Sequence, residues 1–196
     1  MIASPAALIP TRIGEDRIPE PGTNTFGKRL IQRRFCNPDG KEMDFYLFDW
    51  KNGQVSPSII FPLTPEKNVV GIWQFRHGAD KLMLELPGGC PKPGQSAREV
   101  AATELAEETG FQAKTLIQLA PVYFEPAALT VSYVPFLATE CDLSDSGIKL
   151  DDNEYINVEL IPLNDWLMKI KAGDIQDGKT ITTTFLALLQ LGIGMP

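Results

Sequence analysis

The segment from Ser96 to Gly110 constrains the fold most, because helix-ending signals stand at both of its ends. Ser96, followed three residues later by Glu99, predicts a capping box in which each side chain accepts the other residue's backbone N–H. Gly110 stands where a left-handed residue commonly ends a helix. One side of this predicted helix carries small or apolar residues, namely Ala101, Ala102, Leu105 and Ala106. Such a side favours close packing against a sheet.

The other side of the same helix carries Glu104, Glu107 and Glu108 at spacings of three and four residues. Like charges at these spacings destabilise a helix, and carboxylates in the last turn oppose the helix dipole. One interpretation is a solvated acidic face. The other is a set of ligands for a hard divalent cation, which binds carboxylates and backbone carbonyls. The glycine- and proline-rich loop "ELPGGCPKPG" directly upstream offers such carbonyls.

The rest of the chain shows mixed strand and helix patterns, which favour an α+β fold over a doubly wound sheet. Apolar alternation predicts strands over 29–35, 43–50, 58–63, 68–76, 81–86, 115–124, 129–140 and 154–161. Helical periodicity predicts further helices over 162–172 and 180–192, with Gly173 ending the first. Residues 1–55 are expected to form an arm and a small antiparallel β unit, and residues 56–196 the main domain.

Composition excludes several classes of function. The chain has 196 residues and a formal charge of -7, which repels nucleic acids and anionic membrane surfaces. Its first residues lack a basic region, and Pro5 and Pro10 interrupt the apolar run, so we expect a cytoplasmic protein without a signal peptide or membrane helix. Three distant cysteines predict no disulfide framework, and His77 is the one histidine. Acid–base or metal chemistry would therefore rely on carboxylates.

A second carboxylate cluster, "DDNE", occupies residues 151–154. In an extended segment Asp152 and Glu154 point to the same side. The cluster is either a polar turn or a loop that folds over the glutamate helix. In the second case it would supply a carboxylate able to take a proton from water.

Cationic and aromatic side chains are candidates for substrate contact. Arg76, at the end of a predicted strand, is either a surface ion or a phosphate clamp, because a guanidinium binds phosphate bidentately. Aromatic residues of the N-terminal unit can stack on a base, but alternating aromatics are ordinary strand residues, so core packing is the favoured expectation. These aromatics are Phe45, Tyr46, Phe48 and Trp50.

Residues 89–111, "GCPKPGQSAREVAATELAEETGF", resemble the Nudix box, Gx5Ex7REUxEExGU, where U is a bulky apolar residue. The spacing is intact, but Gln95 and Thr103 replace a glutamate and an arginine of the box. A hydrogen bond between these two side chains is our hypothesis for how the chain compensates. The resemblance extends over about residues 30–192 to the ADP-ribose pyrophosphatase-like branch, through "NVVGIWQFR", "LMLELPGG" and the C-terminal half.

This resemblance implies an α/β/α sandwich with a mixed sheet and a Mg²⁺ site, with Mn²⁺ as a possible substitute. The implied metal ligands are Gly88, through its carbonyl, and Glu104, Glu107 and Glu108. It also implies a general base at Asp152 and a further metal or base role for Glu154. Pro126 lies where this branch carries a substrate-contacting proline, although "FEPAAL" replaces the usual "SPG" sequence.

The implied activity is Mg²⁺-dependent hydrolysis of the pyrophosphate bond of a nucleoside diphosphate sugar. ADP-ribose is the preferred substrate, giving AMP and ribose 5-phosphate. The alternatives are a UDP- or GDP-sugar pyrophosphatase, or a weakly active or non-catalytic nucleotide-sugar sensor. The resembling branch also implies a homodimer in which the N-terminal unit helps to build the neighbour's nucleoside pocket.

Overall fold

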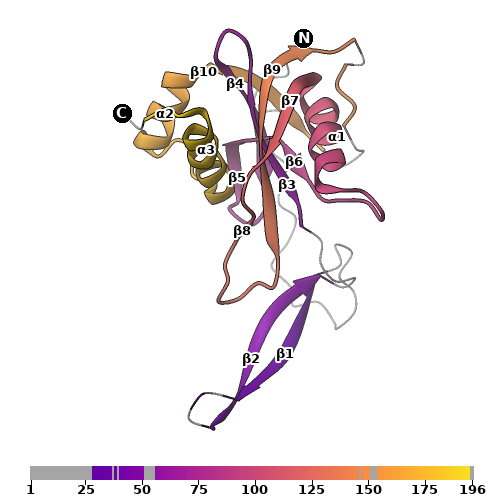
Figure 1. The fold of residues 1–196 in the computed structure, drawn as a ribbon, viewed down its shortest axis with the longest axis vertical. Coiled ribbons are helices and arrows are strands. Elements are labelled where there is room, and N and C mark those ends of the chain that lie inside the picture. The colour runs from indigo at the N-terminus through magenta and orange to yellow at the C-terminus, as the bar shows by residue number, and fades with distance from the viewer. Residues whose placement is uncertain are drawn as a thin grey trace.

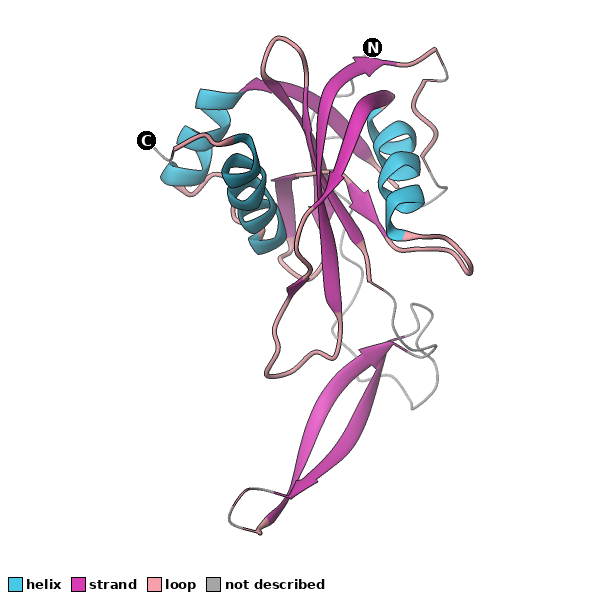
Figure 2. Cartoon of the chain, in the orientation of Figure 1, coloured by secondary structure: helices cyan, strands magenta, loops and turns pink. Residues whose placement is uncertain are grey.

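A mixed sheet separates two helical layers in the computed structural model (Figure 1). The structure describes residues 28–36, 38, 40–50, 56–145, 147–150 and 154–194. Helix α1 (Ala97–Thr109) covers one face of the sheet, and α2 (Leu163–Ala172) and α3 (Gly178–Leu191) cover the other (Figure 2). The expected α/β/α sandwich is confirmed.

Ten strands are present in the described part of the chain. They are β1 (Lys28–Cys36), β2 (Glu42–Trp50), β3 (Ser58–Leu63), β4 (Asn68–Arg76), β5 (Lys81–Glu85), β6 (Gly88–Gly89), β7 (Phe111–Gln118), β8 (Val122–Tyr123), β9 (Ser132–Leu143) and β10 (Ile156–Pro162). The main sheet has the order β10-β4-β3-β9-β7, and β5, β6 and β8 pair with β4, β3 and β9. The β3–β9 pair is parallel and the others are antiparallel, so the sheet is mixed.

Side-chain alternation along the central strands divides the core into two clusters. In β3, Ile59 and Phe61 join a cluster that includes Trp166 of α2, whereas Ile60 joins a cluster that includes Leu105 of α1. Successive residues of a strand point to opposite faces, so one strand contributes to both layers. Both helical layers are thereby fixed against the same rigid sheet.

The hairpin β1–β2 stands apart from the main sheet (Figure 1), as the expected small antiparallel unit. Core packing of its aromatic residues is a wrong expectation in this chain, because Phe45, Tyr46 and Phe48 are 39%, 66% and 53% exposed. A two-stranded unit has no second layer of its own to cover such residues. The side chain of Trp50 lies outside the described residues.

The hairpin joins the main domain at the loop of residues 125–130. The N–H of Phe48 donates to the carbonyl of Ala128 at 2.8 Å, and the N–H of Thr130 donates to the carbonyl of Phe48 at 3.1 Å. The Thr130 hydroxyl also bonds a carboxylate oxygen of Asp49 at 2.6 Å. Backbone pairing therefore connects β2 to the loop that contains Pro126.

One predicted strand differs from the structure. The segment 115–124 is not one strand, since β7 begins earlier, at Phe111, and ends at Gln118 before the short β8. Gly110 ends α1 and passes the chain directly into the sheet, while Pro121 has no N–H to give to a ladder. The predicted arm up to residue 27 lies outside the described residues. In the described part, no helix is long and apolar enough to cross a bilayer.

Candidate functional site

Helix α1 has the two ends that its sequence predicts. Ser96 and Glu99 form the reciprocal capping box, and Gly110 adopts a left-handed conformation with φ 74°. Ala101 and Leu105 are buried against the sheet as expected, but Ala102 is exposed. Ala101 and Leu105 therefore form the side of α1 that packs on the sheet, and the small alanine lets the helix approach it closely.

The acidic side of α1 is not a solvated face throughout. Glu108 is only 3% exposed, and its carboxylate accepts the backbone N–H of Gly88 at 2.8 Å. Burial raises the pKa of Glu108 well above its usual value, and the carboxylates of Glu104 and Glu154 add to the rise. The Gly88 N–H and the Arg76 guanidinium oppose it. The fold thus buries one carboxylate within electrostatic reach of two others.

The two glycines of β6 bring backbone against this cluster. A Cβ atom on Gly89 would lie 2.2 Å from Oε1 of Glu104, and a Cβ on Gly88 would lie 2.2 Å from the carbonyl oxygen of Ser58. Neither position has room for a side chain. The glycines therefore allow α1 and β3 to close on the same short piece of backbone.

Arg76 is placed beside this site by a buried partner. Its Nε and Nη2 atoms donate to the Glu85 carboxylate, with a shortest distance of 2.6 Å, and Glu85 is 1% exposed. Burial lowers the pKa of Arg76, but Glu85, with Asp177 and Glu108 further away, raises it above its usual value. Arg76 is thus not a simple surface ion, because a buried carboxylate fixes its guanidinium.

The residues on either side of the 151–153 segment lie near the C-terminal end of α1. The N–H of Lys149 donates to the backbone carbonyl of Glu107 at 2.9 Å, and Glu154 acts electrostatically on Glu108. Asp152 itself lies outside the described residues. The structure therefore brings Glu154 to the glutamate helix and leaves the position of the expected base open.

Glu107 and Pro126 are the two expected site residues with the fewest described contacts to the cluster. Glu107 is half-buried in the last turn of α1, and its backbone carbonyl accepts the N–H of Lys149. Pro126 is exposed in the turn that precedes Ala128, where the hairpin docks. Pro126 therefore belongs to the loop whose backbone bonds the hairpin.

The hypothesis of a Gln95–Thr103 hydrogen bond is not supported. The side-chain oxygen of Gln95 instead accepts the N–H of Lys92 at 2.8 Å, within the loop before α1. The described contacts of Thr103 include no bond to Gln95. The departures from the box at Gln95 and Thr103 are therefore independent, and Gln95 stabilises the loop in which it lies.

Sequence reasoning missed two parts of this neighbourhood. The first is Glu85, whose signal was a single acidic residue inside the apolar run "KLMLEL". The second is Asp177 with Thr180 at the start of α3, whose signal was the N-cap pattern "DGKT". Glu85 and Thr180 are buried polar groups, which a folded protein keeps only when they are bonded.

The donor set fits a hard divalent cation. All of its members are oxygens: Glu108 bonds the Gly88 N–H, the Glu104 carboxylate lies beside Gly89, and Glu154 acts electrostatically on Glu108. Mg²⁺ and Mn²⁺ prefer such ligands. Burial, and after it the repulsion from Glu104 and Glu154, raises the pKa of Glu108, and a bound cation would relieve this repulsion. Within the described ranges, which omit Asp152, no three His, Cys, Asp or Glu side chains already converge at metal-binding distance.

Comparison with known proteins agrees with this geometry. The NUDIX domain model matches residues 54–183. The chain is 28% identical to the ADP-ribose pyrophosphatase of Bacillus subtilis strain 168 over 152 residues, covering 72% of this chain and 82% of that protein. It is 30% identical to the GDP-mannose pyrophosphatase of Yersinia enterocolitica over 144 residues, covering 69% and 72%.

A solved structure supports the fold independently. The crystal structure of an ADP compounds hydrolase superposes with a TM-score of 0.72 at 18% identity, covering 84% of this chain and 91% of that one. The similarity therefore extends over most of the chain rather than over the acidic helix alone.

Proposed function

Since the chain belongs to the Nudix family of pyrophosphatases, we propose that it hydrolyses the pyrophosphate bond of a nucleoside diphosphate sugar. ADP-ribose is the preferred substrate in this proposal, with AMP and ribose 5-phosphate as products. The names of the relatives support this class, because one is an ADP-ribose and another a GDP-mannose pyrophosphatase. A UDP- or GDP-sugar is therefore the close variant.

The burial of Glu108 within a carboxylate cluster is the observation that carries the proposal. A helix gains no stability from a buried carboxylate near other carboxylates, so the arrangement needs a functional reason. Glu104, Glu107 and Glu108, with the Gly88 carbonyl, would hold Mg²⁺. When bound, the cation neutralises phosphate charge and lowers the pKa of water.

Asp152 is the proposed general base, with Glu154 as a further base or metal ligand. The support is positional, because Lys149 is bonded to the end of α1 and Glu154 acts on Glu108. A carboxylate in this loop takes a proton from the attacking water. The water oxygen then bonds one phosphorus, and the other phosphate leaves as a phosphomonoester.

Arg76 is the proposed contact for the diphosphate. Its Nε and Nη2 atoms are held by Glu85, which leaves Nη1 outside that pair of bonds. Its side chain is 39% exposed, so Arg76 is open to solvent in part. A guanidinium oriented in advance loses little freedom when it binds a phosphate oxygen.

The decisive experiment measures product release from ADP-ribose, a UDP-sugar and a GDP-sugar, with Mg²⁺ and with EDTA. We expect Mg²⁺-dependent release of nucleoside monophosphate and sugar phosphate, fastest from ADP-ribose. Faster turnover of a UDP- or GDP-sugar would change the preferred substrate and leave the chemistry intact. Tight binding of one compound without turnover of any would instead establish a sensor.

A homodimer that includes the hairpin is part of the proposal. The hairpin exposes Phe35, Met43 and Phe45 by 48%, 39% and 39%, and apolar surface of this kind favours a partner. Pro126 lies in the loop whose backbone bonds this hairpin. In the proposed dimer, the hairpin of the other subunit would lie near this loop and help to form the nucleoside pocket. Light scattering of the purified protein tests the proposal, and a monomer at micromolar concentration would reject it.

A further inference from the structure

Three elements hold the short segment from Glu85 to Gly89 by its backbone. The N–H of Leu86 donates to the Thr180 hydroxyl of α3 at 3.0 Å. The carbonyl of Pro87 accepts the N–H of Ile60 in β3 at 2.9 Å, and the N–H of Gly88 donates to Glu108 of α1 at 2.8 Å. The segment that joins Arg76's partner to the carboxylate cluster is therefore clamped from both faces of the sheet.

In the hydrogen bond between α3 and Leu86, the donor and the acceptor are fixed by a third residue. Thr180 is fully buried, and its hydroxyl donates to Oδ2 of Asp177 at 2.9 Å. A hydroxyl has one proton, so once it is given to Asp177 the oxygen is left to accept from Leu86. Asp177 also accepts the backbone N–H of Thr180 at 2.9 Å and forms an ion pair with Lys179 at 2.5 Å.

We propose that Thr180, oriented by Asp177, is a positioning residue for the pyrophosphatase site. By holding the Leu86 N–H it fixes the residue before, Glu85, which orients Arg76. It also fixes the backbone two residues later, where Gly88 meets Glu108. Thr180 thus acts from the opposite helical layer without touching substrate or metal. This inference rests on the proposed function for its kinetic consequence, and on the site geometry alone for its effect on metal binding.

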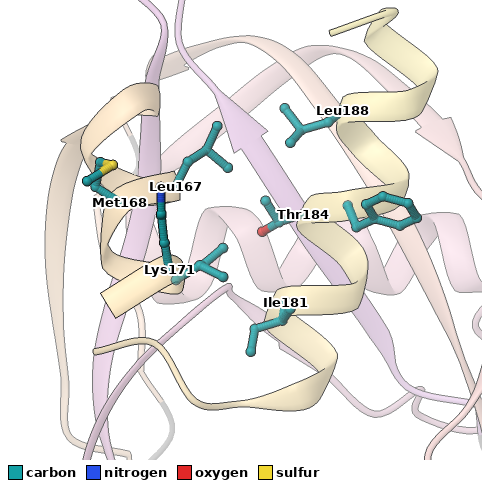
Figure 3. A pocket seen from close by; sticks show the side chains of 8 residues that line it. Leu167, Met168, Lys171, Ile181, Thr184 and Leu188 are labelled. Carbon is teal, nitrogen blue, oxygen red and sulfur yellow. The ribbon is translucent and has the colours of Figure 1, made fainter. Parts of the chain in front are cut away.

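The chain offers a matched control one helical turn further along α3. Thr184 is 1% exposed, and its hydroxyl accepts the Nε1–H of Trp166 at 3.0 Å. Figure 3 shows Thr184 on the side of α3 that faces α2, beside an apolar cavity of about 300 Å³ that Ile181 and Leu188 also line. Both threonines therefore accept one buried N–H, but only the bond of Thr180 leads to the site.

The experiment compares Thr180→Val, Thr180→Ser and Thr184→Val in the full chain. Four quantities are measured: the melting temperature, the Kd for Mn²⁺ by electron paramagnetic resonance, and kcat and KM for ADP-ribose. Each valine leaves a buried N–H without an acceptor, so both valine variants should lose thermal stability. Only Thr180→Val should weaken Mn²⁺ binding and lower kcat, each by about 10- to 100-fold, as loss of an outer-sphere contact does. Thr180→Ser keeps the hydroxyl and should restore both.

The outcomes separate this inference from the proposed function. If Thr180→Val matches Thr184→Val in Mn²⁺ affinity and kcat, Thr180 is a structural residue only, and the proposed function still stands. If the wild type turns over no nucleotide sugar but Thr180→Val still weakens Mn²⁺ binding, the positioning role holds and the proposed activity fails. A wild-type protein that binds no Mn²⁺ would overturn both.

Discussion

Helices α1 and α2, which lie on opposite faces of this sheet, differ in how they treat the helix dipole. Helix α2 has Lys169 and Lys171 in its last turn, where cations favour the helix dipole, and packs the buried Trp166 against the sheet. Helix α1 has no basic residue in its last turn and places Glu107 and Glu108 there. Local stability explains the sequence of α2 but not that of α1. A segment that breaks a local rule inside a consistent fold marks a functional site.

Glu108→Gln should have the largest effect on activity of the variants considered. It should also show most clearly that α1, unlike α2, has a sequence that serves function rather than stability. We expect Mg²⁺-dependent hydrolysis to fall by about 10³-fold, the upper range for loss of one electrostatic group. In EDTA the free energy of unfolding should not fall, because glutamine still accepts the Gly88 N–H and removes a buried charge near Glu104 and Glu154. Rate assays and urea unfolding measure both. Unchanged hydrolysis together with reduced stability would make Glu108 a structural residue.

Asp152→Asn tests the other half of the proposed site. Removal of a general base typically costs about 10²- to 10⁴-fold in rate, so kcat should fall while Mn²⁺ affinity stays close to that of the wild type. Single-turnover rates at saturating Mg²⁺, together with Mn²⁺ titration, distinguish the two quantities. A parallel loss of Mn²⁺ binding would make Asp152 a ligand, and an unchanged kcat would remove it from the reaction.

The sequence predicted the parts of the fold that depend on local chemistry. The capping box at Ser96, the left-handed Gly110 and the end of α2 at Gly173 each follow from a few neighbouring residues, and all are confirmed. Most strands follow from alternation in the same way. The break between β7 and β8 was missed because a strong apolar pattern continues across Pro121.

The site was predictable only in part, because burial is a property of the whole fold. Three glutamates on one helix side could be read from spacing, but not that Glu108 alone would be nearly buried. The partner of Arg76 was equally hidden, since Glu85 lies nine residues away and meets it only after β4 and β5 pair. Thr180 reaches Leu86 across 94 residues, a distance at which no local pattern gives a signal.

A glycine-to-alanine change should affect metal binding at Gly89, which faces α1, and stability at Gly71, which faces α2. In Gly89→Ala the new methyl group meets the carboxylate of Glu104, the mobile end of a flexible side chain. We therefore expect little loss of stability but Mn²⁺ binding weakened by about 10- to 100-fold. In Gly71→Ala the methyl group would lie 2.8 Å from the ring of Trp166, which is fully buried.

For Gly71→Ala we therefore expect the free energy of unfolding to fall by about 1–3 kcal/mol, as in other overpacked cores, with Mn²⁺ affinity unchanged. Urea unfolding and Mn²⁺ titration of both variants complete the comparison. If Gly89→Ala lost stability and kept its metal affinity, the glycine pair of β6 would serve packing alone.

The smallest effects should come from single charges in the last turns of α1 and α2. Lys171→Gln removes a cation from the negative end of α2 and should lower the free energy of unfolding by about 0.3–1 kcal/mol at low salt. Glu107→Gln removes an anion from the same end of α1 and should raise it by a similar amount. Both shifts should shrink in 1 M salt, because salt screens charges that are in contact with solvent. Hydrolysis should decline only in Glu107→Gln, so equal activity in the two variants would exclude Glu107 from the metal-binding set.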